Sequence, residues 1–282
     1  MPFPYKTVLI TGATGGIGRA LAERMIADDI FVIAVGRRSD RLDDLVSKHG
    51  SDKVVAEPFD VSDLEALPAW VENLSCIVLN AGFQRTVDFT RPETISRSLL
   101  TSEVHTNYLS SLHTISLFLP HFISLGKASP NPTPASIVLV SSGLAIVPVA
   151  RCANYCATKS ALRSLAWTLR SQLSAPSSPK TQHIRVIEII PPAVQTELHA
   201  LQSDLVKAGQ KAIGLPLDEF ADETWSHLTA KQGTLHDEIT VDMMRERWEG
   251  IERPRREAFH EFEAMFRRMV SDGEGSVKPA GS

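Results

Sequence analysis

The sequence predicts an α/β protein: a Rossmann-like, doubly wound parallel sheet in a single three-layer α/β/α domain. Strand-like and helix-like segments alternate through about residue 190, which favours right-handed βαβ units. The strand-like segments are continuous apolar runs, as in strands that are buried on both faces. The first of them leads directly into a glycine-rich turn.

The first strand is expected at 7–10, and the glycine-rich turn leads into a helix from about Gly16. Further strands are expected at 30–35, 53–59, 76–79, 136–141 and 184–190, and helices at about 40–49, 62–73, 98–118 and 155–173. The helix at 98–118 should end before Pro120 or kink there, because proline lacks an N–H and clashes with the preceding turn. The proline-rich stretch 126–134 is predicted to be a loop.

The last third of the chain carries weaker signals. A helix is expected near 216–230 and a seventh strand at 238–241, and apolar residues recur at helical spacing from Pro254 onward. We therefore predict one domain over 1–270, in which about 196–270 supplies a substrate loop and an extra C-terminal helix. The tail 271–282 is predicted to be disordered.

Composition excludes several classes of protein. The 282 residues are 43% hydrophobic, which is ample for one large core, and carry a net charge of −4. An acidic balance argues against a nucleic-acid partner, and no apolar stretch is long enough for a membrane span. The three cysteines and nine histidines show no metal-ligand spacing, so no metal is expected. Cysteine use and the absence of a signal-peptide pattern predict a cytoplasmic protein.

The glycine-rich turn reads Thr11-Gly-Ala-Thr-Gly-Gly-Ile-Gly18. Glycine is needed where the backbone bends sharply or where a phosphate approaches the amides closely. The helix N-terminus that follows presents unpaired N–H groups and partial positive charge to a pyrophosphate. The alternative is an ordinary turn. The candidate cofactor-binding residues in this turn are Gly12, Thr14, Gly16, Ile17 and Gly18.

Tyr155 and Lys159 are four residues apart on a predicted helix and therefore share a face. A phenol with an unperturbed pKa near 10 is poorly matched to proton transfer at neutral pH. A neighbouring ammonium group stabilises the phenolate, so we expect Lys159 to lower the pKa of Tyr155. The pair is thus a candidate proton donor for the reduction of a carbonyl.

With these motifs the chain resembles the classical short-chain dehydrogenase/reductase family. The family's glycine pattern is met by Thr11, Gly12, Gly16 and Gly18, and its Asn-Ala-Gly by Asn80, Ala81 and Gly82. Its catalytic serine, thirteen residues before the tyrosine, is met by Ser142, and its helix-borne asparagine by Asn107. These motifs span residues 7 to about 196, and beyond that the resemblance carries little information.

The resemblance implies an oxidoreductase that interconverts a small-molecule ketone or aldehyde and its alcohol. It also implies a homodimer or homotetramer. Ser142 would polarise the substrate carbonyl, Asn107 would hold a water that feeds protons toward Lys159, and Lys159 would also bind the nicotinamide ribose. The remaining implied cofactor contacts are Asp60 and Val61 at the adenine, Asn80 to Gly82 at its ribose, and Pro191, Val194 and Thr196 near the carboxamide. Pro192 departs from the family's usual Pro-Gly.

The second strand ends in Gly36-Arg37-Arg38. An acidic residue about 20 positions after the glycines would bind the ribose 2′-OH of NAD, and Gly36 stands in its place. Two guanidinium groups favour a 2′-phosphate, so NADP(H) is the predicted cofactor. The alternative is that both arginines belong to a solvated loop. Asp60 is equally suited to cap the following helix.

Three questions remain open at the level of sequence. The stretch 196–214 has an apolar face and glycines at 209 and 214, which suits either a mobile lid or an ordinary packed helix. Cys152 and Cys156 flank Tyr155, where buried wall positions are favoured over a redox role. An alternative function is a related protein recruited as a non-redox catalyst or a cofactor-sensing binder.

Overall fold

A computed structural model describes residues 3–65, 74–127, 132–200, 202–210, 212–230 and 237–274. The chain divides into two compact units, Met1–Val241 and Asp242–Ser282. The first unit contains the sheet and all the motifs discussed above. The second contains one long helix, α9 (Asp242–Glu274).

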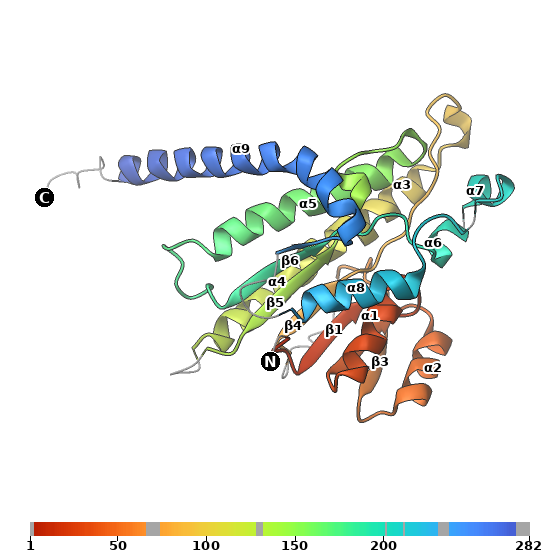
Figure 1. Ribbon diagram of the computed structural model, residues 1–282, viewed down its shortest axis with the longest axis horizontal. Helices are drawn as coiled ribbons and strands as arrows, with labels where there is room; N and C mark the ends of the chain where they lie inside the picture. Colours follow the sequence, from red (N-terminus) through yellow and green to blue (C-terminus); the bar gives the residue numbers. More distant parts are fainter. Residues whose placement is uncertain are drawn as a thin grey trace, which may run out of the picture. The chain divides into compact units, whose positions relative to one another are not determined.

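The first unit is built on a parallel sheet whose seven described strands follow the order β3-β2-β1-β4-β5-β6-β7 (Figure 1). The strands are β1 (Thr7–Thr11), β2 (Phe31–Gly36), β3 (Val54–Pro58), β4 (Cys76–Leu79), β5 (Ala135–Val140), β6 (Ile184–Ile189) and β7 (Glu238–Ile239). Every residue of β4 and β5 is buried, as their continuous apolar sequence predicts. The order reverses between β1 and β4, which places a crevice at the carboxyl ends of these strands.

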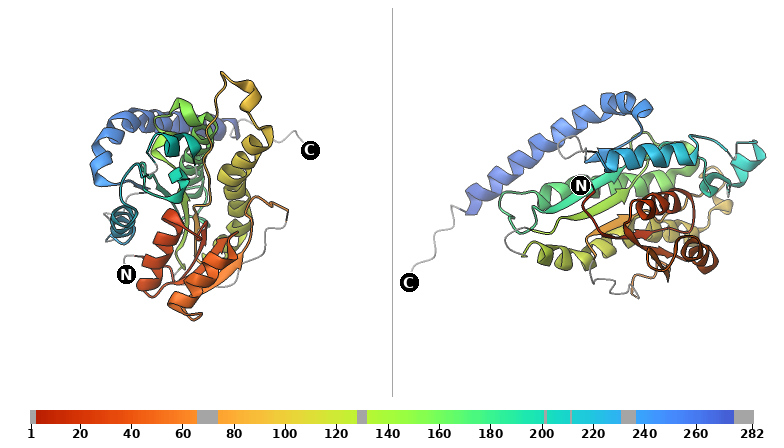
Figure 2. Two further views of the ribbon diagram at one scale, coloured as in Figure 1. Left: turned by 90° about the vertical axis from the view of Figure 1, so that its right-hand side faces the viewer. Right: turned by 60° about the horizontal axis from the view of Figure 1, so that its bottom comes forward.

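Helices cover both faces of this sheet. Figure 2 shows α1 (Gly16–Ala27) on one side of it and α3 (Arg97–Val104) with α4 (Ser110–Leu125) on the other. Helix α8 (Leu217–Leu228) packs on α1, and α5 (Ala153–Leu173) packs on β6. The other helices are α2 (Ser39–His49), α6 (Glu197–Ala200) and α7 (Ser203–Lys207). The predicted three-layer, doubly wound fold is confirmed.

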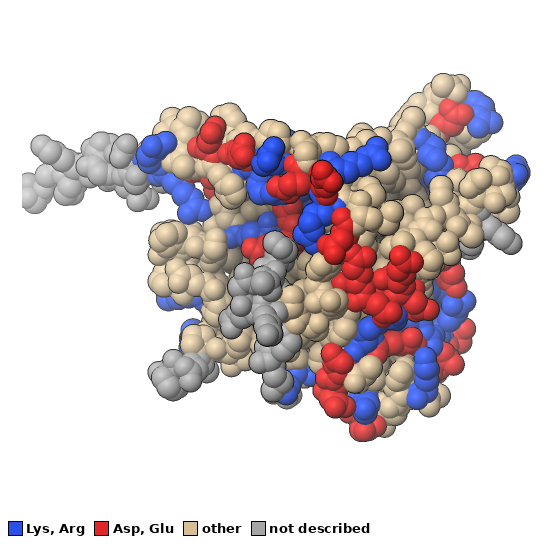
Figure 3. Space-filling model, in the orientation of Figure 1, with Lys and Arg blue, Asp and Glu red and all other residues tan. Residues whose placement is uncertain are grey.

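Acidic side chains gather over α8 (Figure 3). Two of them, Asp218 and Asp222, form ion pairs with Arg24 of α1 at 3.1 and 2.8 Å. Both carboxylates are largely exposed, so each pair adds little to stability. They connect α8 to the second half of α1.

The helix expected at 98–118 differs from its prediction in two ways. A π-helical turn, His105–Leu109, separates α3 from α4, and α4 continues through Pro120 to Leu125. The apolar face explains the continuation: Phe118 and Phe122, on either side of the proline, are buried in the core. Their burial outweighs the hydrogen bond that proline cannot make.

Two other segments differ from expectation or cannot be compared. Of the helix predicted at 62–73, residues 62–65 form turns and bends, and 66–73 lie outside the described residues. Helix α9 begins at Asp242 and includes Pro254, where the sequence predicted a start. The backbone of 271–274, expected to be disordered, is helical, and the rest of the tail lies outside the described residues.

Candidate active site

The glycine-rich turn connects β1 to α1 in a conformation that requires glycine. Gly12 and Gly16 have φ values of +72° and +53°, the left-handed region that other residues avoid. A Cβ on Gly18 would collide with the carbonyl oxygen of Gly12 and with the side chain of Asn80. The N-cap residue of α1 is Gly15, which makes no side-chain capping bond, so the first amides of the helix are suited to bind an anion.

The ends of β1 and β4 are joined by Thr11, which lies at the start of the turn. Its Oγ1 accepts hydrogen bonds from the backbone N–H groups of Asn80 and Ala81 at 3.0 and 3.1 Å. The Asn80 side chain in turn donates to the carbonyl oxygen of Thr11 at 3.0 Å. The Asn-Ala-Gly segment is thereby held against the turn, as a shared cofactor cradle requires.

Ser142, Tyr155 and Lys159 come together at the carboxyl end of β5, and all three are buried. Lys159 Nζ lies 5.7 Å from the centre of the Tyr155 ring and donates to the carbonyl oxygen of Val140 at 2.8 Å. Ser142 begins the short helical turn after β5, and its Oγ accepts the N–H of Leu144 at 3.1 Å. The three polar groups predicted from sequence therefore line one site.

The protonation of Tyr155 differs from the expectation. Burial raises the pKa of its phenol, and the hydrogen bond with Ser142 opposes this only in part. Burial also destabilises the ammonium group of Lys159 and lowers the pKa of Lys159 to about 8. A raised pKa keeps the proton on Tyr155 at neutral pH, which is the form that a proton donor needs.

Asn107 is buried in the π-helical turn between α3 and α4. Its Nδ2 donates to the Phe83 carbonyl oxygen at 2.9 Å and to Thr158 Oγ1 at 3.1 Å, and its Oδ1 accepts the Phe83 N–H at 3.0 Å. A Cβ on Gly82 would lie 3.1 Å from Asn107 Oδ1 and 3.5 Å from Lys159 Nζ. Gly82 therefore lies close to both side chains. π-Helical turns such as the one that carries Asn107 recur at functional sites.

The two predicted phosphate-binding arginines have different positions. Arg38 donates from Nε and Nη2 to Thr14 Oγ1 at 3.0 and 2.9 Å, which holds its guanidinium over the glycine-rich turn. The side chain of Arg37 is 65% exposed, and its nearest described carboxylate is Asp60 at 3.5 Å. Asp60 also accepts two hydrogen bonds from Ser62. Of these two arginines, Arg38 is the one that lies against the glycine-rich turn.

Sequence reasoning missed two charged residues beside this turn, Arg41 and Glu197. Arg41 Nη1 lies 2.7 Å from Glu197 Oε1, and both side chains line a hollow of about 710 Å³ next to Gly15 and Gly16. Arg41 lies in the first turn of α2, three residues after Arg38. Helical spacing from Arg38 was the signal available for Arg41, whereas nothing local predicted Glu197.

The segment after β6 returns to the glycine-rich turn. The carbonyl oxygen of Pro191 accepts the N–H of Gly143, next to Ser142, at 2.8 Å. Val194 forms an isolated bridge with Leu215, and a Cβ on Gly16 would lie 3.4 Å from the Thr196 side chain. Pro191, Val194 and Thr196 thus follow one edge of the crevice, and Pro192 does not prevent this path.

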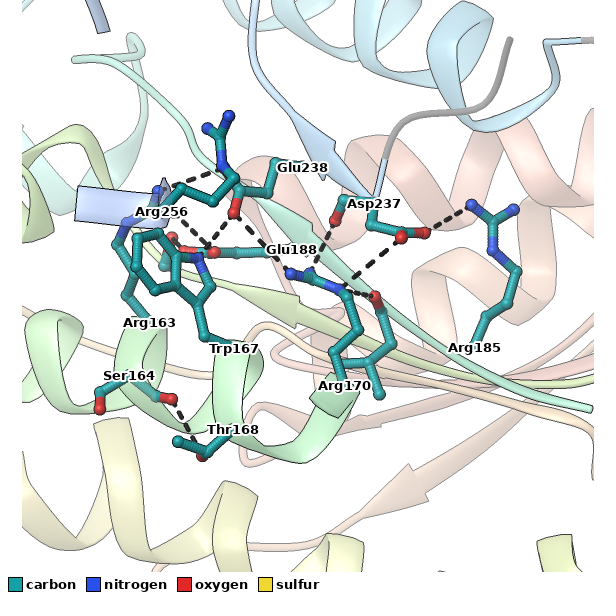
Figure 4. A network of polar contacts seen from close by, with 12 residues as sticks. Arg163, Ser164, Trp167, Thr168, Arg170, Arg185, Glu188, Asp237, Glu238 and Arg256 are labelled. Atoms are coloured by element: carbon teal, nitrogen blue, oxygen red, sulfur yellow. Dashed lines mark hydrogen bonds and ion pairs between the residues drawn. The ribbon is translucent and has the colours of Figure 1, made fainter. Parts of the chain in front are cut away.

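A second missed feature is a buried polar network behind the site (Figure 4). Glu188 on β6 is fully buried and accepts hydrogen bonds from Ser141 Oγ at 2.5 Å and Arg163 Nη1 at 2.7 Å. Arg163 also reaches Glu238 of β7 at 3.2 Å, and Trp167 donates to the same carboxylate at 2.6 Å. Ser141 precedes Ser142, and Arg163 lies one helical turn after Lys159, so this network supports two site residues.

A family model described as short chain dehydrogenase matches residues 6–206. The chain belongs to the short-chain dehydrogenase family. Among curated relatives, an uncharacterized oxidoreductase of Bacillus subtilis, DltE, is 36% identical over 227 residues, 78% of this chain and 83% of that protein. A Saccharomyces cerevisiae benzil reductase that forms (S)-benzoin and a Rhizobium radiobacter serine 3-dehydrogenase are each 31% identical, over 68% of this chain and 73% of theirs.

Solved structures of this short-chain dehydrogenase fold superpose well. The closed form of a serine dehydrogenase complexed with NADP⁺ has a TM-score of 0.68 at 24% identity, over 83% of this chain and 93% of that one. A Brucella melitensis 3-ketoacyl-(acyl-carrier-protein) reductase complexed with NADH has the same TM-score and identity, over 83% and 94%. In the part of this dehydrogenase that the structure describes, every helix is too short or too polar to cross a bilayer.

Proposed function

We propose that this dehydrogenase is an NADP(H)-dependent enzyme that interconverts a ketone or aldehyde and the corresponding alcohol. The observation that carries the proposal is the meeting of Ser142, Tyr155 and Lys159 at the carboxyl end of β5. Ligands bind at this end of open parallel sheets. Membership of an oxidoreductase family supports the same reading.

The residues of the crevice fit a dinucleotide, because the glycines leave room at the turn and the amides of α1 are uncapped. When bound, the nicotinamide supplies or accepts the hydride. Ser142 would hold the substrate oxygen by a hydrogen bond that strengthens as negative charge develops. Tyr155 would donate its proton to that oxygen. Lys159, with a pKa of about 8, would stabilise the phenolate that remains and help to reprotonate it.

The choice of NADP(H) over NAD(H) rests on Gly36 and Arg38. A Cβ on Gly36 would lie 2.5 Å from the Thr14 methyl group, so an acidic residue here would require the Thr14 side chain to move. Arg38 is held over the turn and carries a guanidinium suited to phosphate. Similar solved structures include complexes with NADP⁺ and with NADH, so the proposal depends on these residues.

A panel of ketones, aldehydes and alcohols with NADPH or NADP⁺, followed by NADPH absorbance, tests the function. We expect turnover of at least one carbonyl, and its loss in Tyr155→Phe. The relatives' names make a diketone such as benzil and a 3-hydroxy amino acid such as serine sensible first members. Tight NADPH binding without turnover across the panel would instead support the cofactor-sensing binder.

A further inference from the structure

A carboxylate lies between the two arginines beside the glycine-rich turn. Glu197 Oε2 lies 2.6 Å from Arg38 Nη1, and Oε1 lies 2.7 Å from Arg41 Nη1. Each carboxylate oxygen therefore meets a different guanidinium. The two arginines come from the β2–α2 region, whereas Glu197 is the first residue of α6, more than 150 positions later. The contact is thus made by the tertiary fold.

The geometry at this cluster suits an anion with several oxygens. Thr14 holds Nε and Nη2 of Arg38, which leaves Nη1 directed at Glu197. The side chains of Arg38, Arg41 and Glu197 are 42%, 41% and 43% exposed. Arg41 and Glu197 line the adjoining hollow, and Arg38 lies next to Gly15 at its wall. Arg19 and Asp44 also line the hollow, and they form an ion pair with each other at 2.5 Å.

We propose that Glu197 is the internal counterion of the 2′-phosphate site, and that it sets how strongly the protein discriminates NADP(H) from NAD(H). The proposal rests on the proposed NADP(H) dependence. A phosphate carries about −1.5 to −2 charge at neutral pH and three acceptor oxygens, against one charge and two oxygens for the carboxylate. A phosphate can therefore displace Glu197 from Arg38 and Arg41, whereas the hydroxyl of NAD cannot.

Displacing Glu197 from the two arginines costs binding free energy, and only a ligand with a 2′-phosphate has to displace it. Glu197 weakens the binding of the phosphate form and leaves the hydroxyl form almost unaffected, so it reduces the selectivity of the site. Glu197 also begins the segment that is held at its other end by Asp204, 2.6 Å from Arg151. Release of Glu197 would free the end of this segment nearest the cofactor while the Arg151 contact remains.

The test measures binding without turnover, by titrating 2′,5′-ADP and 5′-AMP into the full chain in a calorimeter at one low ionic strength. Glu197→Gln keeps the shape of the side chain and removes its charge. Because two half-exposed ion pairs are lost, we expect 2′,5′-ADP to bind about three- to tenfold more tightly. Binding of 5′-AMP should change by less than about twofold. Glu219→Gln, an exposed change of equal charge on α8, is the matched control and should leave the ratio of the two affinities unchanged.

The possible outcomes separate the counterion role from the cofactor assignment. If wild-type protein prefers 2′,5′-ADP and Glu197→Gln binds it no more tightly, Glu197 is not a competitor and the inference is wrong. If Glu219→Gln gains as much affinity for 2′,5′-ADP as Glu197→Gln does, the effect comes from net charge alone, and the inference is also wrong. If the wild-type protein binds 2′,5′-ADP no more tightly than 5′-AMP, and Arg38→Ala changes neither affinity, the NADP(H) assignment fails. The inference then fails with it.

Discussion

Burial dominates the chemistry of the individual site residues. Tyr155 and Lys159 are both almost fully covered, and burial disfavours the charged form of each, so the pKa of Tyr155 rises and that of Lys159 falls. The shift at Tyr155 favours a neutral phenol at neutral pH, whereas Lys159 keeps most of its positive charge below pH 8. If the proposed function holds, Tyr155 carries the proton that it would donate before any substrate arrives.

Tyr155→Phe removes the hydroxyl and keeps the ring, so cofactor binding should survive while kcat falls by about 10²-fold or more. Steady-state kinetics on a carbonyl found in the panel, with NADPH affinity measured by fluorescence, would check this. Cys156→Ser, in the next position, is the control and should retain most of the activity. A wild-type kcat in Tyr155→Phe would remove Tyr155 from the mechanism.

Glu188 interacts electrostatically with Lys159 and is expected to act as a positioning residue. Its carboxylate favours the protonated form of the lysine and raises the pKa of Lys159 against the effect of burial. Glu188→Gln should therefore move the Lys159-dependent limb of the kcat/KM profile to lower pH, from its position near 8. Asp237→Asn, a change at a half-exposed carboxylate paired with Arg185, should leave the limb in place. A change in kcat with an unshifted limb would mean a structural role only.

At the scale of elements, the loops at the carboxyl ends of the strands decide what the site can bind. The segment from Thr196 to Gly214 lies between Val194 and Leu215, which form an isolated β-bridge. Its described residues include the short helices α6 and α7. Gly209 and Gly214 both have positive φ values. Short helices and glycines with positive φ are features of segments with low local stability.

We expect this segment to close over bound ligand, because closure excludes water and strengthens the polar contacts of Ser142 and Tyr155. Hydrogen exchange should slow selectively in 196–214 when NADPH and a substrate analogue are both present. The amides of β4 and β5 serve as an internal reference and should stay protected throughout. Equal, strong protection with and without ligands would identify the segment as static scaffold.

The β2–α2 connection is expected to select the cofactor through Arg38 and not Arg37. A charge-assisted hydrogen bond to phosphate contributes roughly 1.5–3 kcal/mol, so Arg38→Ala should weaken NADPH binding about tenfold or more and change NADH binding little. Arg37→Ala, one position earlier and directed at Asp60, is the matched control and should have a smaller effect. Fluorescence titration with each cofactor would decide, and equal losses in both variants would contradict this assignment.

For the whole molecule, the buried ammonium group of Lys159 lowers the free energy of unfolding. A lysine whose pKa falls from 10.5 to about 8 is less stable protonated in the fold than in the unfolded chain. Its destabilising effect is absent above pH 10.5, grows as the pH falls, and is complete below about pH 8. At 1.36 kcal/mol per pKa unit the effect is on the order of 3 kcal/mol.

Lys159→Met should therefore unfold at higher urea concentration than wild type at pH 7, while losing activity. The expected gain is about 1–3 kcal/mol, since the variant also loses the hydrogen bond to Val140. The advantage should shrink as the pH is raised from 8 toward 10.5. Lys6→Met, at an exposed position, should show neither effect. A destabilised Lys159→Met at pH 7 would contradict the direction of the pKa shift.

Much of this molecule could be predicted from residue order. The fold class, the strand positions to within one or two residues, the seventh strand at 238–239 and the helix after Pro216 are local patterns of apolar period and turn residues. The meeting of Ser142, Tyr155 and Lys159 was also predicted, because strand ends and helical spacing place them. The course of the helix through Pro120 was not, because burial of Phe122 decided it.

The sequence by itself determined the sheet, the glycine-rich turn and the types of residue at the site, since each depends on neighbours within a few positions. Only the tertiary structure decided which charges meet. Glu197 reaches Arg38 and Arg41, and Glu188 reaches Ser141 and Arg163, across separations that no local period encodes. The tertiary structure also decided the direction of the pKa shift at Tyr155. Burial depends on packing from every side, whereas helical spacing predicts only the proximity of one neighbour, Lys159.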